Sequence, residues 1–295
     1  MKKLIVNFTP TGMLIGKHQT PHIPLTPEEI IADVREACGI GISSVHLHAR
    51  HPVSGDPVWE KEYFEEIILG IRAFAPELVV SVTTSGRVYN TYEKRSDVLS
   101  LDGDAKPDLA SLTLSSLNFN RTASINDPDM IRALAERMKE REIKPELEVF
   151  DAGMVNYARY LIRKGILTPP YFFNLILGNI ACAQADLLHA GVMINDLPED
   201  SVAVLGGIGN SQLPINTLAV AMGYGVRLGL EDNIWMDEER TVLASNADYL
   251  RRIRSISDAV GRELCTSAEL RSLLDLKPGN GRYGAEPARA SRCHG

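Results

Sequence analysis

The stretch Ile42-Ser43-Ser44-Val45-His46-Leu47-His48-Ala49-Arg50 begins as a buried β-strand and ends in imidazole and guanidinium side chains. Successive side chains of a strand alternate between its two faces, so His46, His48 and Arg50 are predicted to point the same way. Two imidazoles side by side at the end of a strand can chelate one metal ion. The alternative is a buried histidine that only makes a hydrogen bond.

Short apolar runs of this kind recur along the whole chain and alternate with helical stretches. Several are almost continuously apolar, as expected for a parallel sheet that helices cover. Eight strand–helix units match the size of a (β/α)8 TIM barrel, an α/β fold, and we predict that fold. A doubly wound open sheet is the alternative. The predicted strands are Leu4–Phe8, Ser43–His48, Val79–Thr83, Leu109–Leu114, Glu146–Phe150, Phe172–Leu177, Ser201–Leu205 and Gly225–Leu230.

Helix start signals fall between these strands. Thr26-Pro27-Glu28-Glu29 offers an N-cap, a proline at the first helical position and a capping-box glutamate. Asp127-Pro128 gives a similar cap and proline to a helix whose apolar face is Ile131, Leu134, Ala135 and Met138. Near the C-terminus we predict a comparable face from Leu243, Ala247, Leu250 and Ile253.

The composition is that of an ordinary globular protein. The chain has 295 residues, 44% of them hydrophobic, and a net charge of -7, which argues against binding to nucleic acid or to an anionic membrane. No apolar run is long enough for a membrane span or an export signal. Four widely spaced cysteines fit a reducing cytoplasm. We predict one catalytic domain over residues 1–277 and a C-terminal tail over 278–295.

Reactive side chains gather at the predicted strand ends, where barrels of this type carry their active sites. Each residue alone has a structural alternative, such as a strand serine or a glutamate that pairs with a structural counter-ion. Their joint placement favours a functional site. The candidates beyond the first strand quoted are Thr83, Ser85, Ser111, Thr113, Glu146, Glu148, Arg227, Glu231 and Asp232.

A metal ion held by His46 and His48 needs a carboxylate, and Glu231 is the best third ligand. Two imidazoles and one carboxylate with an open fourth position are typical of catalytic zinc. Asp232 could then act as a base that Arg227 fixes and keeps ionised. The turn that contains Gly207, Gly209 and Asn210 could hold an anionic group on its backbone N–H groups, although a plain tight turn is the alternative.

These residues resemble the β-keto acid cleavage enzymes, the family of 3-keto-5-aminohexanoate cleavage enzyme. The resemblance covers nearly the whole chain, from Thr11-Gly12 to about Leu274. The His-x-His-x-Arg segment and Glu231-Asp232-Asn233 are together its most specific parts. Further matching segments are Pro145–Val149, Gly153–Val155, Gly206–Gly209 and Arg227–Leu230.

The resemblance implies a zinc-binding (β/α)8 barrel that forms homotetramers and converts a β-keto acid and acetyl-CoA into acetoacetate and a new acyl-CoA. It implies that His46, His48 and Glu231 are the zinc ligands. Arg227 and Asp232 would support proton abstraction, and Glu148 would be a further active-site carboxylate. Thr83 replaces a family serine, and Ser111 and Thr113 occupy substrate-side positions. We add Ser85 and Arg50 to the substrate-side residues, and Gly207, Gly209 and Asn210 as contacts for acetyl-CoA.

One departure concerns the substrate. The aminohexanoate enzyme has a glutamate soon after Thr-Gly, suited to an ammonium group, whereas this chain has Leu14. Because a leucine cannot pair with a cation, we predict an uncharged R-group on the keto acid. The metal could be Mn2+, Co2+ or Ni2+ instead of Zn2+, because two imidazoles and a carboxylate accept several divalent ions.

The resulting hypothesis is a retro-Claisen reaction. Zinc would chelate the β-keto acid, Asp232 would remove a C2 proton, and the enolate would attack the acetyl thioester. One rival is a metal-dependent aldolase or hydrolase on the same barrel, which would need no acetyl-CoA. A second rival is a non-catalytic barrel that binds a small acid or a metal.

Overall fold

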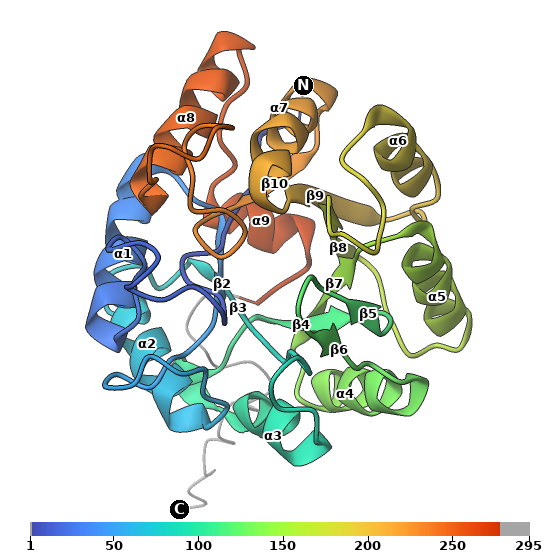
Figure 1. The fold of residues 1–295 in the computed structure, drawn as a ribbon. Helices are drawn as coiled ribbons and strands as arrows, with labels where there is room; N and C mark the ends of the chain where they lie inside the picture. The colour runs from blue at the N-terminus through green and yellow to red at the C-terminus, as the bar shows by residue number, and fades with distance from the viewer. Residues whose placement is uncertain (1, 278–295) are drawn as a thin grey trace, which may run out of the picture.

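Eight parallel strands close into a barrel in the computed structural model, which describes residues 2–277. The closed ring excludes the open doubly wound sheet and confirms the predicted (β/α)8 barrel (Figure 1). Around the ring the strands follow the order β1-β10-β9-β8-β7-β4-β3-β2. They are β1 (Val6–Phe8), β2 (Ser44–Leu47), β3 (Val79–Val82), β4 (Leu109–Thr113), β7 (Lys144–Val149), β8 (Tyr171–Leu177), β9 (Ser201–Gly207) and β10 (Gly225–Leu228).

A ring of helices covers the outside of the barrel (Figure 1). Two predicted caps are present: Thr26 and Glu29 form a capping box, and Asp127 accepts from Asp129 N and Met130 N. The helices are α1 (Pro27–Ile40), α2 (Lys61–Arg72), α3 (Tyr92–Ser96), α4 (Pro128–Glu140), α5 (Ala152–Arg163), α6 (Leu187–Asn195), α7 (Gln212–Met222), α8 (Asn246–Ala259) and α9 (Ser267–Leu273). Short 3-10 turns are η1 (Asp97–Ser100), η2 (Gly103–Ala105) and η3 (Gly209–Ser211).

The alternation of strand side chains divides the interior into two apolar regions. Outward-facing residues such as Phe8, Val45 and Leu147 pack against the helices in the main core. A smaller cluster fills the inside of the barrel at the end where the strands begin, which we call the lower end. There Phe172 packs with residues of other strands and of the α9 segment. Its buried members are Ile5, Val79, Leu109, Phe172, Val204, Cys265, Leu270 and Leu274. The lower end is therefore closed, and only the opposite end is left for a polar site.

A buried ion cluster attaches α9 to this lower end. Asp108, just before β4, accepts from Arg72 Nη2 at 2.8 Å and from Arg271 Nη2 at 2.8 Å. Both arginines also donate to the Leu78 carbonyl. Because a buried carboxylate needs paired donors, this cluster sets where α2 and α9 meet the barrel.

Three features differ from the sequence-based expectation or lie beyond it. A two-stranded hairpin, β5 (Leu117–Asn118) and β6 (Ala123–Ser124), follows β4 and was not predicted. Leu243 precedes α8 instead of belonging to its apolar face, because Ser245 and Asp248 form a capping box that starts the helix at Asn246. The expected tail, 278–295, lies outside the described residues. Within residues 2–277, no helix combines the length and apolarity that crossing a bilayer requires.

Candidate metal centre and active site

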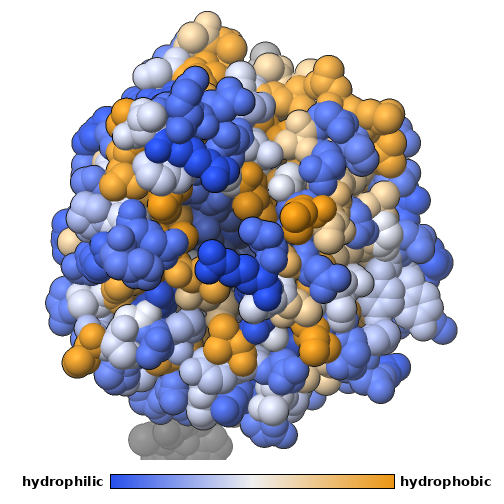
Figure 2. Space-filling model, in the orientation of Figure 1, coloured by the Kyte–Doolittle hydropathy of each residue, from blue (hydrophilic) through white to orange (hydrophobic). Residues whose placement is uncertain are grey.

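Polar side chains line the barrel interior above the apolar cluster. Inward positions of the strands carry hydroxyl, amide, imidazole and carboxylate groups, all of them buried: Asn7, Ser44, His46, Ser81, Ser111, Glu146, Glu148, Asn174 and Arg227. Figure 2 shows a hollow near the centre of this end of the molecule, hydrophilic inside and bordered by both hydrophilic and hydrophobic residues. The arrangement places the candidate chemistry at the C-terminal ends of the strands, as in other barrels of this type.

His46, His48 and Glu231 form a group that could hold a metal ion. Their ligand atoms all lie within 4.8 Å of one another. The two Nε2 atoms are 3.3 Å apart, and His48 Nε2 lies 3.3 Å from Glu231 Oε1. Tetrahedral zinc with bonds of about 2.0–2.1 Å places two nitrogen ligands about 3.3 Å apart. Glu231 Oε2 is buried and has no hydrogen-bond partner in the described part of the chain, so the donor set fits such an ion.

Glu231 lies on a turn, not on a strand. Strand β10 ends at Leu228, so Glu231 comes after the strand and does not lie on the same strand face as Arg227. The turn packs tightly against the loop after β1: a Cβ on Gly229 would lie 2.0 Å from the Thr9 carbonyl oxygen, and one on Gly12 would lie 2.6 Å from Glu231 Cγ. These two glycines allow the close approach that sets the carboxylate beside His48.

Arg227 holds both acidic residues of this turn. Its Nε donates to Asp232 Oδ2 at 2.8 Å, and its Nη2 donates to Asp232 Oδ1 at 3.1 Å and to Glu231 Oε1 at 2.8 Å. Burial, with Glu231 nearby, raises the pKa of Asp232 above its ordinary value although Arg227 opposes the shift. Burial would also raise the pKa of Glu231, but Arg227 and His48 hold it well below its usual range. The two neighbouring carboxyls therefore differ in basicity, as a ligand and a base should.

Glu148 lies on the other side of Arg227. Its Oε2 accepts from Thr113 Oγ1 at 2.7 Å, and its Oε1 is 3.8 Å from Arg227 Nη1. That Nη1 is itself buried without a hydrogen-bond partner among residues 2–277. Burial raises the pKa of Glu148 although His46 and Arg227 oppose the shift. An unpaired guanidinium N–H at the centre of the site is available to an anionic ligand.

The other predicted substrate-side residues divide between the site and the scaffold. Thr83 and Ser85 line a small pocket that also touches His48. Ser111 is buried, and its Oγ accepts from Thr84 N at 3.0 Å. Its hydroxyl therefore also holds the loop after β3.

Leu14 and Arg50 come from the loops around the mouth. Leu14 is 52% exposed, and its neighbour Met13 lines the pocket beside His48. Arg50 is buried, and its three guanidinium nitrogens donate to the backbone carbonyls of Gly12, Ile15 and Gly55 at 2.6–3.0 Å. Arg50 thus ties the loop after β1 to the loop after β2, and with them the backbone that contacts Glu231.

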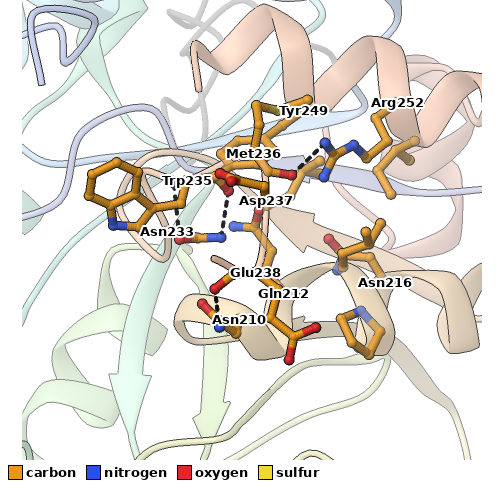
Figure 3. Close-up of a pocket in the computed structure, with 14 residues that line it drawn as sticks. Asn210, Gln212, Asn216, Asn233, Trp235, Met236, Asp237, Glu238, Tyr249 and Arg252 are labelled. Atoms are coloured by element: carbon orange, nitrogen blue, oxygen red, sulfur yellow. Dashed lines mark hydrogen bonds between the residues drawn. The ribbon is translucent and has the colours of Figure 1, made fainter. Parts of the chain in front are cut away.

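The glycine-containing segment at the end of β9 and in the turn after it mostly contacts other parts of the protein. Gly209 has φ +58° and donates its N–H to the Asp232 carbonyl at 2.8 Å. A Cβ on Gly207 would lie 2.3 Å from the Ser211 carbonyl oxygen. Asn210 lines a cavity of about 150 Å³ between α7, α8 and the 233–238 loop, and its amide donates to the Glu238 carbonyl (Figure 3). Of the three candidates, Asn210 is therefore the one that faces an open space.

Two residues at the site were not assigned a role from the sequence. Glu146 is fully buried beneath the histidines and contacts His46 Nδ1 at 2.8 Å. Burial would lower the pKa of His46, but Glu146 raises it to about 9. Arg87, half-buried, lies 3.9 Å over the Phe119 ring, and its Nε donates to Thr122 Oγ1 at 3.0 Å. Only contacts across distant strands and loops identify both residues.

Comparison with known proteins decides the family. The family model for beta-keto acid cleavage enzyme matches residues 3–276. The chain belongs to this family. It is therefore an enzyme, and the resemblance expected from the His-x-His-x-Arg and Glu-Asp-Asn segments is confirmed.

Individual relatives of this β-keto acid cleavage enzyme align along nearly their whole length. The 3-keto-5-aminohexanoate cleavage enzyme of Fusobacterium nucleatum is 33% identical over 280 residues, which cover 94% of this chain and 99% of that protein. The 3-oxoadipate:acetyl-CoA acetyltransferase of Cupriavidus necator is 32% identical over 275 residues, covering 92% and 94%. The apo structure of ObcA has a TM-score of 0.74 at 20% identity and covers 87% of this chain and 66% of that chain. At that identity the likeness shows the fold alone.

Proposed function

We propose that this enzyme converts a β-keto acid and acetyl-CoA into acetoacetate and the acyl-CoA of the remaining R-group. The observation that carries the proposal is the juxtaposition of the His46–His48–Glu231 group with the Arg227–Asp232 pair. Relatives at 26–33% identity bear names that combine β-keto acids with acetyl-CoA transfer or cleavage. The site and the family therefore point to the same class of reaction.

We propose Zn2+ as the metal, with Mn2+, Co2+ or Ni2+ as substitutes, held by His46, His48 and Glu231. When bound there, a divalent ion would act as a Lewis acid that polarises the keto oxygen of the substrate. The unpaired Oε2 of Glu231 and the 3.3 Å spacing of the imidazole nitrogens support this assignment.

Asp232 is the proposed base. In the retro-Claisen sequence it takes a proton from C2, and C2 then forms a bond to the carbonyl carbon of acetyl-CoA as the CoA thiolate leaves. The thiolate adds to the original keto carbon, the bond between C2 and that carbon breaks, and C2 recovers the proton as acetoacetate departs. Arg227 orients Asp232 through Nε and Nη2, and its unpaired Nη1 can bind a substrate carboxylate oxygen between Asp232 and Glu148.

For the R-group we propose an uncharged chain. The pocket beside His48 is lined mainly by apolar and aromatic side chains, with Met13, Trp59 and Tyr89 among them. Lys94 Nζ lies 5.0 Å from the Tyr89 ring centre and 5.5 Å from that of Trp59, and Arg95 also lines the pocket, so the pocket already contains two cations. Together with Leu14 in place of a carboxylate, this disfavours a positively charged R-group.

For acetyl-CoA we propose contacts along the rim of the barrel. Gly207, Gly209 and Asn210 stand on one side, where Asn210 faces the cavity of Figure 3. Arg87 stands on the loop after β3, and its terminal nitrogens have no hydrogen-bond partner in the described chain. Desolvation lowers the pKa of Arg87 while the attraction of Glu231 opposes the shift. Both co-substrates are anionic and suit such a group.

We also propose a homo-oligomer, with a tetramer as the expected form. The outer face of α6 is apolar: Leu187 and Leu188 are 75% and 73% exposed, and Val192 continues the same face. An exposed apolar patch of this kind is typical of a protein–protein interface. Light scattering on the purified protein measures the mass directly. The cytoplasmic location and the absence of nucleic-acid and membrane partners stay predictions.

A panel of β-keto acids with acetyl-CoA tests the function. Mass spectrometry should detect acetoacetate and the matching acyl-CoA in equal amounts, and neither product when acetyl-CoA is left out. Products without acetyl-CoA would favour a metal-dependent aldolase or hydrolase instead. Stoichiometric metal with no turnover across the panel would point to a non-catalytic barrel.

A further inference from the structure

Glu146 sits at the centre of the barrel, directly below the metal-binding group. It is fully buried on β7, and four side chains from four other strands surround its carboxylate. Oε1 accepts from Asn7 Nδ2 at 2.8 Å and from Asn174 Nδ2 at 2.9 Å. Oε2 accepts from Ser81 Oγ at 2.5 Å and faces His46 Nδ1 at 2.8 Å.

These contacts decide which nitrogen of His46 carries a proton. Asn7, Asn174 and Ser81 all donate to Glu146, and an ionised carboxylate can only accept, so Nδ1 of His46 must be the donor. A metal ion binds the neutral ring, in which the proton on Nδ1 leaves the lone pair on Nε2. Nε2 is the atom that lies 3.3 Å from His48 Nε2, so the lone pair faces the metal-binding group.

The partners of Glu146 also hold the carboxylate in place. Ser44 Oγ donates to Asn7 Oδ1 at 2.8 Å, which orients the Asn7 amide so that its NH2 faces Glu146. The strand register agrees, because His46 is paired with Ser81 across β2 and β3, and Asn7 with Ser44 across β1 and β2. The carboxylate thus links β1, β2, β3 and β8 to its own strand β7.

We propose that Glu146 is a positioning residue for the metal centre, which fixes the Nδ1–H form of His46 and aims its Nε2 at the ion. The inference rests on the metal site put forward under the proposed function. Carboxylates that orient a metal-binding histidine usually contribute 10–100-fold to metal affinity. The sequence assigned no such role to Glu146, because its partners come from strands far apart in the chain.

The first test needs no variant. Two-bond histidine 15N–1H spectra of the zinc-loaded wild-type protein report which ring nitrogen carries the proton. We expect His46 to show a hydrogen-bonded Nδ1–H and a metal-bound Nε2. A His46 that carries its proton on Nε2, or binds zinc through Nδ1, would overturn the proposal.

The second test compares two variants of the same network by zinc competition with a chelator of known affinity. Glu146→Gln should weaken zinc binding about 10–100-fold and change the His46 Nδ1–H signal. Asn174→Ser is the matched control: it removes a donor to Oε1, the oxygen that does not touch His46, and should lower the melting temperature without a comparable loss of zinc affinity. If Glu146→Gln folds and binds zinc as tightly as wild type, Glu146 is only structural.

The outcomes separate this inference from the proposed function. A wild-type protein that binds zinc with the expected His46 form but turns over no β-keto acid would contradict the function and leave the role of Glu146 intact. If wild type turns over a β-keto acid and Glu146→Gln binds zinc as tightly as wild type, the function is supported and the role of Glu146 is contradicted. The spectra of the wild type decide the matter even if Glu146→Gln does not fold.

Discussion

Arg227 donates two parallel hydrogen bonds to Asp232, from Nε to Oδ2 at 2.8 Å and from Nη2 to Oδ1 at 3.1 Å. A bidentate pair of this kind fixes the carboxylate in orientation as well as in charge. Asp232→Asn keeps the size of the side chain but removes its basicity. We expect kcat to fall about 10²–10⁴-fold, the range for a lost general base, in assays with saturating substrates. Metal content measured by mass spectrometry should stay unchanged, and a variant with near wild-type kcat would show that Asp232 is not the base.

His46→Ala should remove the metal and the activity together. The variant lacks one of three ligands, and two remaining ligands bind a divalent ion far more weakly than three. Metal analysis of the purified protein should drop from about one ion per chain to a small fraction of that. His189→Ala is the control, because His189 is exposed on α6 and, among residues 2–277, forms an ion pair only with Asp186. A metal-free His46→Ala protein with full turnover would refute the metal site.

Leu14→Glu should change the charge of the R-group that the enzyme accepts. A carboxylate at this exposed loop position can pair with an ammonium group, which leucine cannot. We expect kcat/KM for a β-keto acid with an ammonium-bearing R-group to rise at least tenfold, and that for a neutral analogue to fall. Leu14→Gln, of the same size without the charge, should not show the gain. Efficient wild-type turnover of the cationic substrate would contradict the assignment of Leu14.

Arg87→Gln should raise the KM for an anionic substrate about tenfold, the effect of losing one charged hydrogen bond. Separate titrations of acetyl-CoA and of the keto acid show which of the two Arg87 contacts. Arg121→Gln is the matched control, since Arg121 is an exposed arginine on the β5–β6 hairpin that Arg87 contacts through Thr122. If Arg87→Gln and wild type have the same KM for acetyl-CoA and the same KM for the keto acid, Arg87 contacts neither substrate.

Asp33 predicts a pH dependence of stability. Burial raises its pKa from 3.8 to about 6, although Asn246 Nδ2 donates to it at 2.6 Å. Between these values the folded protein keeps a proton that the unfolded chain releases, so the free energy of unfolding falls as pH rises from about 4 to about 6. Asp33→Asn should remove this loss and stabilise the protein above pH 6 by about 1–3 kcal/mol.

Urea unfolding at pH 4.5 and pH 7.5 measures the effect of Asp33→Asn. The gain over wild type should be larger at pH 7.5. Glu65→Gln, at an exposed position on α2, serves as the control for a lost negative charge. An equal effect of Asp33→Asn at both pH values would contradict the raised pKa.

Local patterns predicted most of the fold. All eight barrel strands overlap the predicted runs, because the outward face of each strand packs against the helices and carries apolar residues. Thr26 and Asp127 start their helices as expected, since a cap depends only on neighbouring backbone N–H groups. The β5–β6 hairpin was missed because two-residue strands have too short a pattern to recognise.

Of the three proposed metal ligands, only the two that share one strand are placed together by a sequence repeat. His46 and His48 follow from the two-residue repeat of β2, but the position of Glu231 does not, because it lies on a turn beyond β10. The sequence also placed Arg50 among the substrate-side residues, whereas its nitrogens meet three loop carbonyls. No sequence pattern indicates that an arginine side chain donates hydrogen bonds to backbone carbonyls elsewhere in the chain.

By itself, then, the sequence determined the strand and helix content, the polar inner row of β2 and the family. Closure of the barrel decided the rest. It pairs Asn7 of β1 with Arg227 of β10 on one side and with Ser44 of β2 on the other, which brings Glu231 to His48 across 183 residues of chain, from 48 to 231. It also surrounds Glu146 with donors from four strands. Such contacts depend on strand register around a closed ring, and local sequence patterns do not specify that register.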